Sequence, residues 1–284
     1  MVIAQRGGWR TALPRALGVL LALLLLGYGA VLAKLWWGQE GLIFQPTPLP
    51  ATHRFALPAD VHEVFVDVPG ARLNALHLRR PDPQGVVFFL HGNAGNLERW
   101  FVNLDFYRAL NVDLFMPDYR GFGKSTGAIE SEAQLLADVQ AAWQAIAPAY
   151  EGRRVVFVGR SLGTGLAASL AAALPPERRP DALVLISPYR SMVAMAAEQY
   201  PLVPSVLLRY PLQTDLALVQ LAGSRTRVQL LHGDRDALIP LAHSEALAKA
   251  LPGVTLQRIE GAGHGDLQSF PAYLDALRAA IQPP

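Results

Sequence analysis

The sequence predicts an α/β fold built on a mostly parallel, eight-stranded sheet flanked by helices. From about residue 61 onward, short β-rich runs alternate with helical patterns, which is typical of strands joined by helical crossovers. Runs such as VVFFL and ALVLI are apolar throughout, as strands buried on both faces should be. With 284 residues, 51% of them apolar and 17% charged, the chain is long enough to bury a large core.

The expected strands and helices alternate along this part of the chain. We expect strands at residues 62–68, 72–79, 86–90, 112–116, 155–158, 182–186, 227–231 and 254–259. We expect helices at about 96–110, 130–147, 162–174, 240–251 and 266–281. Pro69 and Gly70 are a turn signal, so the first two strands should form a hairpin. Residues 188–215, rich in Leu and Pro, interrupt this alternation of strands and helices and predict a short helical lid after the sixth strand.

The N-terminal part of the chain has a different character. We divide the chain into a basic tail (1–15), a transmembrane anchor (16–37), a proline-rich linker (38–60) and a folded domain (61–284). Residues 16–33 carry no charge, and a helix of that length spans about 27 Å, close to the hydrocarbon thickness of a bilayer. Arginines before this segment favour a cytoplasmic N-terminus, with the domain on the opposite, periplasmic or lumenal side. A cleaved signal peptide, which would give a secreted protein, is the alternative.

The composition excludes several classes of protein. The chain has no cysteine, so a cysteine nucleophile, a disulfide scaffold and an iron–sulfur site are excluded. A net charge of only +2 argues against a nucleic-acid-binding surface. The seven histidines show no spacing typical of metal ligands, and we expect neither a metal nor another cofactor. GFGKST at residues 121–126 resembles the end of a P-loop, but Asp118 stands where that motif needs glycine.

The strongest local motif is VVFVGRSLGTG at residues 155–165. It places Gly159, Ser161 and Gly163 directly after an expected strand and before an alanine-rich helix, which is the setting of a nucleophile elbow. The structural alternative is a glycine-rich turn whose serine caps the helix. Serine is a weak nucleophile that needs a general base, so the elbow predicts partner residues farther along the chain.

Two suitable partners follow in the order Ser, Asp, His. Asp236 lies in LLHGDRDALIP after the seventh expected strand, and His264 lies in IEGAGHGDL after the eighth. We expect His264 to take the proton of Ser161 and Asp236 to orient the imidazole. Asp234 competes for the acid role, and we prefer Asp236 because it lies farther beyond the strand.

An oxyanion hole requires two main-chain amides beside the serine. One should be the amide of Leu162, the residue after the nucleophile. The other should come from the loop HGNAGN at residues 91–96, where Asn93 is our first choice and Ala94 the second. We expect His91 in the same loop to be structural.

Together these motifs resemble the α/β-hydrolase superfamily over about residues 60–282. HGNAGN, PDYRGFGKSTG (117–127), VGRSLGTG, SPYRSM (187–192) and HGDRDALIP match a branch of membrane-anchored serine hydrolases that includes lysophospholipid lipases and protein depalmitoylases. The resemblance implies hydrolysis of a carboxylic ester or thioester through an acyl-enzyme on Ser161, without a cofactor. A serine peptidase and a non-catalytic binding protein of the same fold are the alternatives.

The expected substrate is a small molecule or a lipid-like acyl ester. The anchor would hold the site near a bilayer, and methionine and leucine in residues 188–212 suit an adaptable apolar surface. The alternative is that this segment only packs against the sheet and that the substrate is small and soluble.

Overall fold

The computed structural model describes residues 9–283, and the chain divides into two units, Met1–Leu42 and Ile43–Pro284. Residues 1–8 of the expected basic tail lie outside the described residues. Helix α1 (Trp9–Ile43) contains the expected anchor and also takes in residues assigned to the tail and the linker. Its segment Pro14–Ile43 is long and apolar enough to cross a membrane, although signal sequences and core helices share this property.

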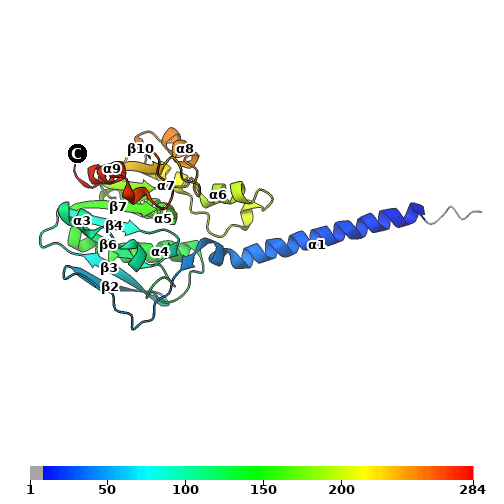
Figure 1. Cartoon of the computed structure of the whole chain (residues 1–284), viewed down its shortest axis with the longest axis horizontal. Coiled ribbons are helices and arrows are strands. Elements are labelled where there is room, and N and C mark those ends of the chain that lie inside the picture. Colours follow the sequence, from blue (N-terminus) through cyan, green and yellow to red (C-terminus); the bar gives the residue numbers. More distant parts are fainter. Residues whose placement is uncertain (1–8, 284) are drawn as a thin grey trace, which may run out of the picture. The chain divides into compact units, whose positions relative to one another are not determined.

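A single eight-stranded sheet runs through the second unit in the order β10-β9-β8-β7-β4-β6-β3-β2 (Figure 1). Its strands are β2 (Val61–Val68), β3 (Ala71–Leu78), β4 (Gly85–Leu90), β6 (Asp113–Pro117), β7 (Arg154–Arg160), β8 (Ala182–Ile186), β9 (Arg227–Gly233) and β10 (Val254–Ile259). β2 and β3 form the expected antiparallel hairpin, β3 is antiparallel to β6, and the remaining neighbours are parallel. The prediction of a mostly parallel sheet of eight strands is confirmed.

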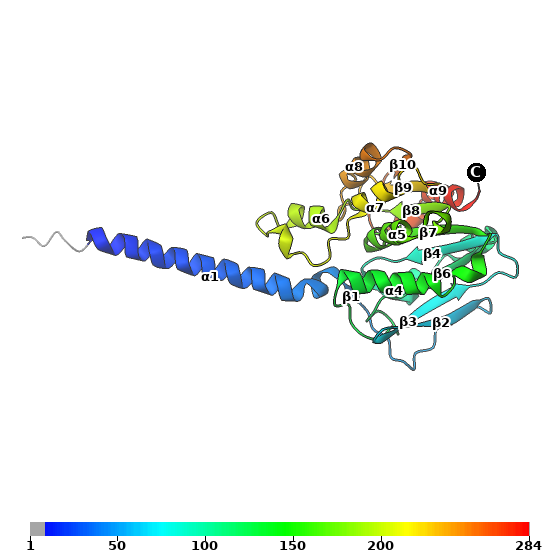
Figure 2. The ribbon, with the colours of Figure 1, turned by 180° about the vertical axis from the view of Figure 1, so that it is seen from behind.

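Helices cover both faces of this sheet, which Figures 1 and 2 show from opposite sides. One face packs against α4 (Glu132–Gln144), α5 (Leu162–Ala173), α7 (Thr214–Leu221) and α8 (Ala242–Ala250), and the other against α2 (Leu97–Trp100), α3 (Leu104–Ala109) and α9 (Pro271–Ile281). In β4, Phe88 belongs to the first apolar cluster and its neighbour Val87 to the second. Because successive strand residues point to opposite faces, a strand covered on both sides has to be apolar at every position.

Two expected helices are interrupted. The helix expected at 96–110 is split into α2 and α3 because Asn103, between them, has a left-handed backbone with φ 58°. The helix expected at 266–281 is a short 3-10 turn, η4 (Leu267–Ser269), followed by α9. Proline disfavours helical backbone in the residue before it, so Phe270 is extended and Pro271 starts a new helix.

The helical insertion after the sixth strand of the sheet, β8, is present. It consists of α6 (Met192–Gln199) and η3 (Ser205–Leu207), and α7 then follows as a helix that we did not expect. The remaining short turns are η1 (Ala147–Tyr150) and η2 (Pro176–Arg178).

The segment expected as a linker contains structure of its own. Ile43 and Phe44 are buried in the core, and β1 (Gln45–Pro46) pairs in parallel with β5 (Ala94–Gly95). Two-residue strands carry no periodicity, so composition alone did not predict this pairing. The pairing joins the chain just after α1 to the HGNAGN loop.

Candidate active site

The expected nucleophile lies where the strand order of the sheet reverses. β4 and β7 are neighbours, but the chain leaves β4 for β6 on one side and returns to β7 on the other. Open α/β sheets bind ligands in the crevice beyond the carboxyl ends of such strands. Ser161 directly follows β7, and the 91–96 loop directly follows β4. A Cβ placed on Gly92 would lie 3.7 Å from the Cβ of Ser161, so this loop passes beside the serine.

Ser161 occupies a tight strand-to-helix turn. Its backbone has φ 52° and ψ −118°, a conformation that is costly for a residue with a side chain. A Cβ on Gly159 would lie 2.3 Å from the carbonyl oxygen of Gly163, and a Cβ on Gly163 would lie 2.0 Å from that of Leu90. Glycine is therefore required at both positions for the strand, the turn and α5 to approach so closely. The G-x-S-x-G spacing is explained by this packing.

The structure brings Ser161, His264 and Asp236 together from three separate strand ends. His264 Nε2 lies 3.1 Å from Ser161 Oγ, and His264 Nδ1 lies 2.8 Å from Asp236 Oδ2. A carboxylate accepts only, so the proton of the neutral imidazole belongs on Nδ1. Nε2 is then free to accept the serine proton, which is the arrangement that activates a serine hydroxyl.

Asp236 is held from both sides. Its Oδ1 accepts hydrogen bonds from the amides of Leu238 (3.0 Å) and Ile239 (2.8 Å). Burial by itself raises the pKa of Asp236, but hydrogen bonds from His232, His264 and the Ile239 amide outweigh it and hold the pKa well below its usual range. The carboxyl group therefore stays ionised beside the imidazole that it orients.

His232 is a contributor that sequence reasoning missed. It is fully buried, and its Nε2 lies 2.9 Å from the Ile239 carbonyl and 3.4 Å from Asp236 Oδ2. Both of those groups accept, so Nε2 carries the proton and Nδ1 accepts from Ser244 Oγ at 2.7 Å. The only sequence signal was its position four residues before Asp236 in LLHGDRD.

The competing acid, Asp234, has a different place. It is exposed, and its Oδ1 accepts from the amide of Gly261 at 2.7 Å. Asp234 thus stabilises the start of the loop that carries His264, whereas Asp236 contacts the imidazole itself.

The two residues expected to supply the oxyanion amides belong to segments that adjoin Ser161. Leu162 is the first residue of α5, and Asn93 lies in the loop beside Ser161. Among the described residues neither amide has a protein acceptor, so both are available to a ligand. Asn93 is fixed by its other groups, because its carbonyl accepts from Gln45 N at 2.7 Å and its Nδ2 donates to the Ile43 carbonyl at 3.0 Å. Ala94, our second choice, accepts from the Trp100 indole.

A cavity of about 340 Å³ opens in front of Ser161 and His264. It mixes aromatic, aliphatic and basic side chains, and none of the described residues that line it is Asp or Glu. Its other side-chain-bearing lining residues are Phe89, Asn93, Ala94, Arg99, Trp100, Val102, Asn103, Tyr107, Arg160, Leu238, Gln268 and Tyr273. None of residues 188–215 lines it, so the helical insertion does not form the wall of this cavity in the structure.

Comparison with known proteins identifies the family. A family model described as "Serine aminopeptidase, S33" matches residues 81–211. "Uncharacterized protein MT2364" of Mycobacterium tuberculosis is 31% identical over 275 residues, which cover 93% of this chain and 94% of that protein. "Alpha/beta hydrolase domain-containing protein 17B" of Xenopus tropicalis is 30% identical over 219 residues, 75% of this chain and 72% of the relative. The chain belongs to the α/β-hydrolase superfamily.

Solved structures agree with this fold. An α/β hydrolase from Vibrio vulnificus covers 78% of this chain and 82% of its own, with TM-score 0.65 and 20% identity. An esterase from Pyrococcus furiosus covers 84% of this chain and 99% of its own, with TM-score 0.64 and 16% identity. At this identity the likeness establishes the α/β-hydrolase fold, as the sequence motifs predicted.

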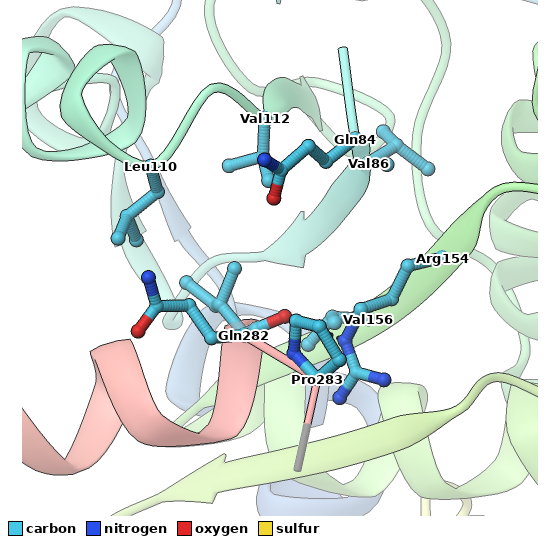
Figure 3. A pocket seen from close by; sticks show the side chains of 10 residues that line it. Gln84, Val86, Leu110, Val112, Arg154, Val156, Gln282 and Pro283 are labelled. Atoms are coloured by element: carbon cyan, nitrogen blue, oxygen red, sulfur yellow. Dashed lines mark hydrogen bonds between the residues drawn. The ribbon is translucent and has the colours of Figure 1, made fainter.

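A second cavity, whose lining side chains are drawn in Figure 3, lies at the starts of β4 and β7, the ends of these strands away from Ser161. It measures about 10 Å³, which is room for about one water molecule. Arg154, at the start of β7, lines it and donates from Nε to the carbonyl of Ile281 at 2.6 Å, at the end of α9. These contacts fasten the C-terminal helix to the sheet, so this region is structural.

The GFGKST segment also has a structural explanation. Lys124 donates from Nζ to Glu63 Oε1 at 2.7 Å and to the His53 carbonyl at 3.0 Å. A lysine engaged in this way is not placed to contact a phosphate, in agreement with the rejection of the P-loop reading.

Proposed function

We propose that this hydrolase is a serine hydrolase that cleaves a carboxylic ester or thioester through an acyl-enzyme. The observation that carries the proposal is the continuous chain of contacts from Ser161 through His264 to Asp236, at 3.1 and 2.8 Å. Ser161 attacks the carbonyl carbon while His264 takes its proton, and His264 then returns the proton to the leaving oxygen or sulfur. Water then attacks the acyl-enzyme carbonyl while His264 takes its proton, and His264 returns this proton to Ser161 Oγ as the carboxylic acid is released.

The amides of Leu162 and Asn93 complete the proposed site. When Ser161 attacks, negative charge develops on the carbonyl oxygen, and two fixed amide donors stabilise it more than they stabilise the ground state. Leu162 follows Ser161 in the chain, Asn93 lines the same cavity as Ser161, and neither amide has a protein acceptor among the described residues. Asp236 keeps the proton of His264 on Nδ1 and balances the charge of the imidazolium.

The cavity supports a substrate with an apolar acyl part. Phe89, Trp100, Val102 and Leu238 present apolar surface, and the volume of about 340 Å³ is near the lower end of ordinary ligand pockets. A short or medium acyl chain therefore fits inside, and a longer chain has to extend out of the cavity. The hypothesis of a lipid substrate is now supported by the anchor helix alone, because residues 188–215 do not line this cavity.

Aminopeptidase activity is the second candidate, because the matching family model is described as a serine aminopeptidase. Recognition of a free peptide N-terminus requires groups that stabilise an ammonium ion, and a carboxylate is the usual one. None of the described cavity-lining residues is Asp or Glu, whereas two of them are arginines. This charge pattern favours the ester proposal.

Active-site labelling and turnover test the proposed function together. The purified full-length chain in detergent should react with a fluorophosphonate probe and hydrolyse p-nitrophenyl butyrate. Ser161→Ala should abolish labelling and lower turnover by up to about a millionfold, as in other serine triads. Labelling that persists in this variant contradicts the nucleophile assignment. A series of acyl chain lengths and aminoacyl p-nitroanilides then separates short esters, long esters and aminopeptidase substrates.

We further propose that α1 anchors the hydrolase in a membrane with the folded domain on the periplasmic or lumenal side. Support comes from the length and apolarity of Pro14–Ile43 and from the arginines that precede it. Fusion of alkaline phosphatase to the C-terminus should give an active reporter in a bacterial host, and the mass of the purified protein should include residues 1–33. A chain that begins near residue 34 indicates a cleaved signal peptide instead.

A further inference from the structure

Arg160 is a charged residue in the cavity that the proposed chemistry does not use. It is the last residue of β7 and immediately precedes Ser161. Its guanidinium donates to Gln268 Oε1 at 3.0 Å and to the His264 carbonyl at 2.9 Å, while its Nε is buried without a hydrogen-bond partner. Among the described residues, no carboxylate forms an ion pair with it. Two neutral oxygens are thus its hydrogen-bond acceptors.

Arg99 adds a second positive charge to the same cavity. Its guanidinium lies 6.0 Å from the ring of Trp100, and that of Arg160 lies 5.4 Å from the same ring. Arg99 is exposed and, like Arg160, has no carboxylate in ion-pair contact among the described residues. Both guanidinium groups therefore lie near one indole ring, and both residues line the cavity.

The nearby carboxylates do not neutralise these arginines through contact. Asp236 is hydrogen-bonded to His264, and Asp266 accepts from the amide of Gly263 at 2.7 Å. Burial is the largest effect on the pKa of Arg160 and lowers it, as does the charge of Arg99, whereas Tyr273, Asp236 and Asp266 act at a distance to raise it, and the net shift is downward. A partly desolvated guanidinium without a counterion is unfavourable, and an anionic ligand that supplies the counterion recovers this free energy.

We propose that the substrate ester carries an anionic group, a carboxylate or a phosphate, which Arg160 and Arg99 bind inside the cavity. The inference rests on the proposed ester hydrolysis and adds the charge of the substrate to it. The planar guanidinium fork suits the two oxygens of a carboxylate or a phosphate. The anion lies on the acyl part or on the leaving group, depending on which part of the ester occupies the space beside Trp100.

Arg160 also holds the loop of His264, so a purely positioning role has to be distinguished. Loss of a positioning contact would slow neutral and anionic esters by the same factor. Loss of an anion-binding contact would slow anionic esters selectively. The ratio of the two kcat/KM values therefore separates the two roles, whatever happens to the absolute rates.

Two pairs of substrates test the proposal on the full-length chain. The first pair, p-nitrophenyl hexanoate and mono-p-nitrophenyl adipate, places the charge on the acyl part. The second pair, 1-butanoylglycerol and 1-butanoylglycerol 3-phosphate, places it on the leaving group and is followed by titration of released acid. In at least one pair, kcat/KM for the anionic ester should exceed that for the neutral ester by about tenfold, and the advantage should shrink as salt is added.

The matched variants are Arg160→Met, Arg99→Ala and, as a control, Arg54→Ala. Arg54 is exposed and does not line the cavity. Arg160→Met should lower the anionic-to-neutral ratio about tenfold and Arg99→Ala by a smaller factor, whereas Arg54→Ala should leave it unchanged. Equal loss for both esters, or a neutral preference in both pairs, overturns the proposal. Should Arg160→Met fail to fold, Arg99→Ala and the salt dependence decide. Absence of turnover on all four esters contradicts the proposed ester hydrolysis instead.

Discussion

Replacement of Asp236 by Asn gives the sharpest test of the proposed mechanism. In the structure Oδ1 of Asp236 accepts from two main-chain amides, Leu238 N and Ile239 N, at 3.0 and 2.8 Å. An Asn at this position keeps its carbonyl oxygen on those amides, so its NH₂ group occupies the place of Oδ2. That group then faces His264 Nδ1, 2.8 Å away in the parent protein. Two N–H donors cannot satisfy each other, so the imidazole has to move its proton to Nε2.

The expected loss follows from this tautomer change. Nε2, 3.1 Å from Ser161 Oγ, would carry a proton and could no longer accept the one from the serine. The same substitution in another serine triad leaves the geometry intact and lowers turnover by about ten-thousandfold, which corresponds to about 5 kcal/mol of activation free energy. We expect a loss of this size in kcat for p-nitrophenyl butyrate. Fluorophosphonate labelling should slow in parallel because it uses the same general base.

Asp234→Asn is the matched control. Asp234 is exposed, and an Asn carbonyl can accept from Gly261 N as the carboxylate does. We expect kcat within about threefold of the parent protein because Asp236, not Asp234, contacts His264, and we expect the free energy of unfolding to change by about 0.5 kcal/mol or less. Thermal unfolding of both variants should show that each is folded at the assay temperature. The reasoning would be refuted if kcat fell by less than about a hundredfold in a folded Asp236→Asn, or if kcat fell by more than that in Asp234→Asn.

Three further substitutions test other parts of the structure. Gly163→Ala places a Cβ 2.0 Å from the main-chain oxygen of Leu90, so we expect little folded protein in expression and thermal-melt assays, because neither backbone can move away cheaply. His77 is buried, and burial lowers its pKa to about 4. The folded state therefore loses about 3 kcal/mol of stability as pH falls from about 6.5 towards 4. His77→Gln should remove this part of the loss, as measured by urea titrations at pH 7 and 4.5. Asn93→Ala removes the bond to the Ile43 carbonyl but keeps the main-chain amide, so kcat should fall by about tenfold or less, whereas a loss comparable to that of the nucleophile variant would mean that the side chain itself takes part.

The strands were predictable because each is a short apolar run between turn residues. Each expected strand overlaps an observed one, and the runs 182–186 and 254–259 match without a shift. Helix boundaries were harder to predict, because the backbone conformation of a single residue can decide where a helix ends. The left-handed Asn103 and the proline after Phe270 each divide a segment whose apolar pattern is continuous. Those divisions matter for function, because residue 103 lines the cavity at one of them.

The candidate site was predictable to the extent that its residues follow strands. Ser161, Asp236 and His264 come after β7, β9 and β10, and parallel strands bring their carboxyl ends to one edge. The wall of the cavity was not predictable in this way. Trp100, Val102 and Tyr273 reach it from helical connections, and their approach depends on tertiary packing that no local pattern encodes.

The segment after α1 shows how the expected linker bears on the active site. Its two-residue strand β1 pairs with β5, and the amide of Gln45 and the carbonyl of Ile43 both bond to Asn93. The side chain of Asn93 is therefore occupied by the last residue of α1 and its carbonyl by Gln45 of β1, and its main-chain amide is left for the proposed oxyanion. An oxyanion donor stabilises a transition state only if its direction is fixed beforehand. The residues that join the helix to the folded domain thus belong to the support of the proposed active site, and a redesign that replaced them with a flexible linker would release the loop that carries this amide.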